Sequence, residues 1–148
     1  MGWERPNWYA PPGVLPRYEY SYDRQNWFPH SAEEHRAVRE AVGLFDQTSF
    51  GKFLLQGQDA ESALQRLCAN DVAGPVGRVV YTAMLNERAG IECDLTVTRI
   101  RQDTYFIVTG AAVTVHDFDW IRRNLRDDER ATLTDVTSSY AVLGVMGP

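Results

Sequence analysis

Polar and apolar side chains alternate along residues 91–100, and this segment holds the residue types best suited to chemistry. The polar positions are Glu92, Asp94, Thr96 and Thr98, and the apolar positions are Ile91, Cys93, Leu95 and Val97. A β-strand points successive side chains to opposite faces, so the pattern predicts one polar and one apolar face. The polar face is either the solvated side of a sheet, which alternation alone favours, or a binding surface. In the second interpretation Asp94 accepts hydrogen bonds from N–H groups of a ligand and Thr96 supports it.

The histidines and cysteines indicate structural roles. His30, His35 and His116 form no His-Glu-x-x-His or comparable pattern. Cys68 lies on the apolar side of an expected helix and Cys93 on the apolar side of an expected strand, so both are predicted to be core residues. Their spacing is unlike that of a zinc-binding pair. We therefore expect no bound metal.

Two large enzyme classes lack their characteristic loops in this chain. There is no Gly-x-Ser-x-Gly segment, which argues against a serine hydrolase of the usual strand–turn–helix type. There is also no Gly-x-Gly-x-x-Gly or Walker segment, so the chain is not expected to hold a dinucleotide or a nucleoside triphosphate by itself.

The elements that must position the polar face are those of an α+β domain. Ser31 and Glu34 form a capping-box pattern, which predicts a helix from Ser31 to a C-cap at Gly43. Helical spacing of apolar residues predicts further helices at residues 59–68 and 113–125. Strands are predicted at residues 53–55, 79–85, 91–100, 105–109, 131–136 and 140–145. The segments 79–85, 91–100 and 105–109 are joined by short turns and predict an antiparallel meander, which favours the α+β class.

The first thirty residues differ from the rest, because aromatic residues and prolines are crowded there. Trp3, Trp8 and Trp27 are examples. Proline disfavours regular helix, and so many aromatic residues would be wasted in a disordered tail. We predict an aromatic, proline-rich arm at residues 1–30 that packs on this domain or on a partner, followed by a folded portion at residues 31–148.

Composition narrows the possible partners. The chain has 148 residues, with 15 Lys+Arg, 20 Asp+Glu and a formal net charge of −5. This acidic balance argues against a nucleic-acid partner. No apolar run approaches the ~20 residues of a membrane span, and no apolar signal segment follows Met1. We therefore expect no nucleic acid, no membrane and a cytoplasmic location.

Several segments together resemble the aminomethyltransferase (glycine-cleavage T-protein) family. They are residues 42–53 (VGLFDQTSFGKF), 81–98 (YTAMLNERAGIECDLTVT), 105–109 (YFIVT), 135–137 (DVT) and 143–148 (LGVMGP). Residues 4–9 (ERPNWY), and Arg39 followed by residues 43–49 (GLFDQTS), are most similar to the subgroup fused to dimethylglycine and sarcosine dehydrogenases. Cys93 stands where the glycine-cleavage proteins carry a second acidic residue, which also favours the fused subgroup. The family module is much longer, so we expect the chain to be its N-terminal portion.

The resemblance implies a three-lobed fold with tetrahydrofolate in a central cavity. The aspartate that matches Asp94 contacts the folate amine nitrogens and assists proton movement, so Asp94 is the expected catalytic and folate-binding residue. Thr96 points the same way and would support it. The other matched positions expected to border the folate are Tyr81, Met84, Leu85, Phe106, Val108 and Gly110.

In the fused subgroup a flavin domain oxidises an N-methyl amine to an iminium, which meets tetrahydrofolate and forms 5,10-methylenetetrahydrofolate. The resemblance therefore implies an enzyme whose FAD belongs to a separate domain absent from this chain. Its expected partners are folate, a small amine-derived one-carbon donor, the missing C-terminal lobes, and a flavin domain or subunit. We expect the fragment alone to be inactive.

Two alternatives stay open at this point. The first is a folate-fold protein without transfer chemistry, such as an iron–sulfur or tRNA-modification relative or a structural subunit of an amine oxidase complex. The second is an unrelated α+β binding module whose aromatic arm is a protein interface.

Overall fold

The computed structural model describes residues 6–148 and divides them into two compact units. One unit is formed by Gln47–Val142, and the other by the described residues up to Asp46 together with Leu143–Pro148. Each unit is described separately. Trp3 of the expected arm, and Glu4 and Arg5 of the segment 4–9, lie outside the described residues.

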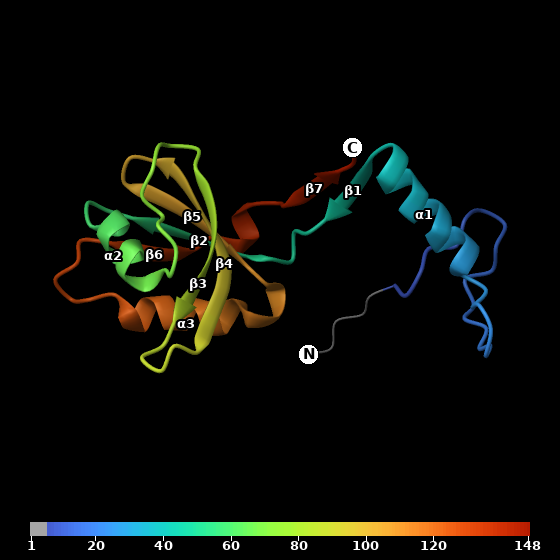
Figure 1. Cartoon of the computed structure of the whole chain (residues 1–148), viewed down its shortest axis with the longest axis horizontal. Coiled ribbons are helices and arrows are strands. Elements are labelled where there is room, and N and C mark those ends of the chain that lie inside the picture. The colour runs from blue at the N-terminus through green and yellow to red at the C-terminus, as the bar shows by residue number, and fades with distance from the viewer. Residues whose placement is uncertain (1–5) are drawn as a thin grey trace. The chain divides into compact units, whose positions relative to one another are not determined.

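A five-stranded antiparallel sheet is the centre of the Gln47–Val142 unit (Figure 1). Its strands are β2 (Gly51–Gln56), β3 (Val79–Leu85), β4 (Ile91–Arg101), β5 (Thr104–Thr109) and β6 (Thr132–Asp135). Their order across the sheet is β3-β4-β5-β2-β6. The predicted meander is confirmed, because β3, β4 and β5 are consecutive neighbours paired antiparallel.

The core lies between this sheet and two helices, α2 (Ala60–Leu67) and α3 (Thr114–Asn124). Phe53 of β2 and Ile107 of β5 are fully buried, and they are paired across the two strands. The Phe53 ring meets the ring of Phe118 on α3 edge to face, with centroids 5.3 Å apart. Fully burying one large apolar side chain contributes about 1.5–3 kcal/mol, so this layer supplies much of the stability of the unit. The α+β class is confirmed.

Helix α2 was predicted from its apolar spacing, and its buried residues are Ala60, Ala63 and Leu64. The two alanines allow its backbone to approach the sheet closely. Tyr105 of β5 is buried, and its hydroxyl donates a 2.9 Å hydrogen bond to Glu61 of α2. Burial and this hydrogen bond raise the pKa of Tyr105 to about 12.

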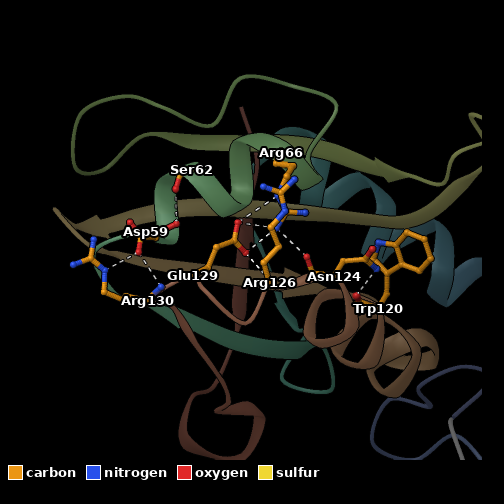
Figure 2. Close-up of polar contacts among 8 residues, drawn as sticks. All are labelled: Asp59, Ser62, Arg66, Trp120, Asn124, Arg126, Glu129 and Arg130. Carbon is orange, nitrogen blue, oxygen red and sulfur yellow. Dashed lines mark hydrogen bonds and ion pairs between the residues drawn. The ribbon is translucent and has the colours of Figure 1, made fainter.

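A charged clamp ties α2 to the loop before β6 (Figure 2). Arg66 of α2 donates through Nη2 to both carboxylate oxygens of Glu129, at 2.8 and 2.7 Å, and to the Asn124 carbonyl at 2.9 Å. At the other end of the helix, the backbone N–H and Nε of Arg130 both donate to Asp59. The loop therefore closes over α2 by hydrogen bonds at both ends of the helix.

The second unit contains α1 (Phe28–Glu40) and a two-stranded antiparallel ribbon of β1 (Gly43–Asp46) and β7 (Leu143–Met146). The predicted start of α1 at Ser31 is wrong, because the helix begins three residues earlier with Pro29 in its first turn. Proline suits that position, since the first N–H groups of a helix have no intrahelical partner. Strand β7 is shorter than predicted and pairs with β1, which the sequence did not predict as a strand.

Residues 6–27 of the expected arm contain no helix or strand. Asn26 bridges two points of the arm, because its Nδ2 donates to the Arg17 carbonyl and its Oδ1 accepts from the N–H of Glu19. The rings of Tyr18 and Tyr20 pack with centroids 4.9 Å apart. Among the described residues no helix is long and apolar enough to cross a bilayer.

Candidate functional site

The sheet face opposite α2 and α3 carries the polar residues of β4, and we call it the open face. Its members follow from the strand registers and are Val79, Tyr81 and Ala83 of β3, Asp94, Thr96 and Thr98 of β4, Phe106 and Val108 of β5, and Lys52 and Leu54 of β2. The alternation predicted for β4 is confirmed over most of its length, because Cys93, Leu95 and Val97 are buried on the helix-covered side. Asp94 is exposed, and Thr96 and Thr98 are half-buried.

Asp94 and Tyr81 are diagonal neighbours on this face. Asp94 pairs with Ala83, and Tyr81 pairs with Thr96, two positions further along β4. Diagonal neighbours on an antiparallel pair are within reach of a long aromatic side chain. A hydrogen bond to the Asp94 carboxylate raises the pKa of the Tyr81 phenol above its ordinary value. The pair therefore presents a carboxylate acceptor and a phenol donor side by side, and 67% of Tyr81 is exposed.

Thr96 and Val108 continue the row that starts at Tyr81. Val108 of β5 is paired with Thr96, and Phe106 is paired with Thr98. The next step of the same register beyond the Leu95–Thr109 pair places Gly110 beside Asp94, just after β5 ends. Five of the residues predicted for the site (Asp94, Thr96, Tyr81, Phe106 and Val108) thus lie on one surface, and Gly110 lies at its edge.

Met84 does not belong to this surface. It pairs with Cys93 and is fully buried on the helix-covered side. Leu85 follows a register shift that pairs it with Ile91 and leaves Glu92 unmatched, and it is exposed at the end of β3. Val79–Leu85 is mostly apolar on both faces, and its threonine, Thr82, is buried on the helix-covered side, so alternation did not indicate which residues point to the helices.

Lys52 was not predicted for the site, although it is the sole lysine of the chain. It pairs with Val108, which places it at the far end of the row from Tyr81. The side chain is fully buried, and its Nζ donates to the carbonyls of Thr48 at 2.7 Å and Tyr140 at 2.9 Å. The Tyr140 ring packs edge to face on Phe106, with centroids 5.2 Å apart. The segment around Tyr140 therefore covers the β2 side of the open face and leaves the β3–β4 side exposed.

The GCVT N-terminal domain family model matches residues 1–148 of the chain. The chain belongs to the GCVT N-terminal domain family. A solved structure agrees with this assignment: aminomethyltransferase T of the glycine cleavage system from Bartonella henselae is similar over 78% of this chain and 32% of its own, with a TM-score of 0.72 and 26% identity. The antiparallel sheet with its packed helices is thus the fold of a GCVT N-terminal domain, as expected.

The curated proteins similar to this GCVT domain include an oxidase and a dehydrogenase of methylated amino acids. The 4-methylaminobutanoate oxidase (formaldehyde-forming) of Paenarthrobacter nicotinovorans is 44% identical over 147 residues, which is 99% of this chain and 18% of that protein. The mitochondrial dimethylglycine dehydrogenase of Rattus norvegicus is 36% identical over 148 residues, or 99% of this chain and 17% of that protein. The chain thus spans less than a fifth of these relatives. It is an aminomethyltransferase-type domain related to dimethylglycine dehydrogenase.

Proposed function

We propose that the open face is one wall of a tetrahydrofolate site, completed by lobes that lie outside this chain. The observation that carries the proposal is that Asp94 and Tyr81, diagonal neighbours across β3 and β4, are both exposed on the sheet face that α2 and α3 leave uncovered. Because Asp94 is exposed, its acceptor oxygens are accessible to a ligand. The aromatic arm of residues 1–30 would pack against the same missing lobes.

In this proposal Asp94 accepts hydrogen bonds from N–H groups of the folate and relays a proton during transfer. Thr96, its neighbour on the same face, supports the carboxylate. Phe106 and Val108 supply apolar surface beside it, and Gly110 allows the ligand to approach the backbone closely. General acid–base catalysis by a positioned carboxylate is worth roughly 10²–10⁴ in rate.

The reaction would join an iminium to tetrahydrofolate. The N-methyl amine would be oxidised to this iminium by loss of a hydride, for which FAD held in a separate domain would supply the acceptor. One folate nitrogen adds to the iminium carbon, the carbon–amine bond breaks, and the second folate nitrogen closes the ring to 5,10-methylenetetrahydrofolate. The two protons that the folate nitrogens lose leave with the amine as its ammonium form, and Asp94 is the group placed to carry them. Holding both reactants together supplies a further proximity gain.

Calorimetric titration of folinic acid into the whole protein that contains this domain tests the binding role. Asp94→Ala removes a charged acceptor worth about 1.5–3 kcal/mol, so affinity should fall roughly 10–150-fold. Asp127→Asn, in a loop outside the sheet, is the matched control and should bind normally. Unchanged affinity in Asp94→Ala would exclude the proposed role.

Product analysis separates transfer from simple oxidation. With an N-methyl amine, an electron acceptor and tetrahydrofolate, the whole protein should form 5,10-methylenetetrahydrofolate, and Asp94→Ala should release formaldehyde instead. The Paenarthrobacter relative is named as formaldehyde-forming, so measuring both products distinguishes transfer to folate from release of formaldehyde. Folate binding with neither product would favour the alternative of a non-catalytic folate-fold protein.

The cytoplasmic location stays a prediction, and the rat relative is named as mitochondrial.

A further inference from the structure

Three potential metal ligands from two elements meet on the helix-covered side of the sheet. They are the thiol of Cys93 on β4 and the side chains of His116 and Asp117 in the first turn of α3. One ligand atom from each lies within 4.8 Å of the other two. Cys93 is 1% exposed and the Asp117 side chain 1%, whereas the His116 side chain is 52% exposed and opens the group to solvent.

We propose that Cys93, His116 and Asp117 form a binding site for Zn²⁺. Thiolate, imidazole and carboxylate are the three ligand types that zinc takes in proteins. Bonds of about 2.0–2.3 Å place tetrahedral ligand atoms roughly 3.3–3.6 Å apart, so shifts on the order of 1 Å would close the group on a metal. His116 Nδ1 and Asp117 Oδ1 are already 2.9 Å apart. Three protein ligands leave the fourth position for water.

The surrounding groups already hold these ligands in orientation. The other imidazole nitrogen, Nε2 of His116, lies 3.5 Å from Oε2 of Glu92. Asn86 in turn donates a 2.7 Å hydrogen bond to Oε1 of Glu92. The Thr109 hydroxyl donates to Oδ2 of Asp117 and leaves Oδ1 for the site. A carboxylate on the second nitrogen of a ligating histidine is the usual support of protein zinc sites.

Asp117 contacts both of the other ligands of the group. The Cys93 thiol and the His116 ring both hydrogen-bond to Asp117. Burial and the neighbouring Asp117 raise the pKa of Cys93, and hydrogen bonding to Asp117 raises the pKa of His116. Zinc takes a thiolate and a neutral imidazole as ligands, so its binding displaces the thiol proton of Cys93. Asp94 faces the opposite side of β4, so this proposal does not depend on the folate proposal.

Titration of the full chain with Co²⁺, followed by displacement with Zn²⁺, tests the site. The wild type should develop a thiolate-to-cobalt charge-transfer band that Zn²⁺ removes. Cys93→Ser should abolish the band, whereas Cys68→Ser, at the other buried cysteine, should keep it. His116→Asn changes a half-exposed residue and should fold normally but lose affinity, whereas His35→Asn should match the wild type. Glu92→Gln should weaken binding roughly 10–100-fold.

Three results would overturn the proposal. One is a wild type without the charge-transfer band, and another is a band that persists in Cys93→Ser. The third is an equal loss of affinity in His35→Asn and His116→Asn, which would indicate adventitious binding to surface histidines. Circular dichroism of each variant at the same protein concentration shows whether it is folded. If Cys93→Ser does not fold, the affinity of His116→Asn for the metal tests the proposal instead.

Discussion

The Asp94 carboxylate and the Tyr81 phenol interact across β3 and β4, and this contact holds the Tyr81 proton in place. The carboxylate accepts a hydrogen bond from the phenol and repels the phenolate, so both effects raise the pKa. Asp94→Asn should lower the pKa of Tyr81 toward the ordinary tyrosine value of 10.0. A pH titration of ¹³C-labelled tyrosine rings followed by NMR measures the change. Tyr105 is the internal control, and an unshifted Tyr81 would contradict the contact.

Lys52 should resist chemical modification in the folded chain. Its amine is fully buried, and it is the sole lysine. An amine-reactive ester should therefore label only the α-amino group under native conditions, since a buried, hydrogen-bonded ammonium is not accessible to the reagent. In concentrated urea the same reagent should add two labels. Intact-mass spectrometry counts the labels, and equal labelling rates in both conditions would disprove the burial of this side chain.

Acid should weaken the clamp between Arg66 and Glu129. Burial alone would raise the pKa of Glu129, but hydrogen bonds from Arg66 and Arg126 outweigh burial and hold it below 4.5. A carboxyl with a lowered pKa in the folded state adds stability above its unfolded pKa, and that stability disappears as the pH falls through the folded pKa. Glu129→Gln should cost about 1 kcal/mol of unfolding free energy at pH 7.

Urea titrations at pH 7 and below pH 4 measure this effect. The difference between wild type and Glu129→Gln should shrink toward zero in acid, because protonation of the wild-type carboxyl removes the same interaction. A constant difference at both pH values would mean that packing, and not charge, sets the cost of the substitution.

Phe53 should be among the most costly residues to truncate. It is fully buried between β2 and α3 and contacts Phe118 edge to face. Phe53→Ala removes this contact and leaves a cavity, which typically costs about 3–5 kcal/mol. Val115→Ala, at a position of α3 that is 84% exposed, should change stability by less than about 0.5 kcal/mol. Thermal unfolding of the two variants provides the comparison.

The sequence correctly predicted the helices and strands whose apolar residues recur with a clear period. The two-residue alternation of β4 and the apolar spacing of α2 both appear as expected. The burial of Met84 on the helix-covered side was not predictable, because β3 is mostly apolar on both faces and alternation could not assign its orientation. The α1 start was misplaced because the Ser31–Glu34 pattern competed with Pro29, which lies in the first turn of a helix that begins at Phe28.

Local sequence patterns could not predict contacts between residues that are distant in the sequence. Cys93 and His116 are brought together by the packing of α3 on β4, and no spacing rule for zinc ligands covers such a pair. Lys52 donates hydrogen bonds to the carbonyls of Thr48 and of Tyr140, which is 88 positions away in the sequence. Strand β1 is too short to be distinguished from a loop, and its partner β7 lies about a hundred residues later.

The first and last residues of the Gln47–Val142 unit lie next to each other in space. The N–H of Gln47 donates a 2.8 Å hydrogen bond to the carbonyl of Val142, so the two ends of this 47–142 segment touch. Adjoining ends are the geometry that suits a segment to insertion into a surface turn of another protein, or to circular permutation, in which the ends are joined and new ones are opened elsewhere.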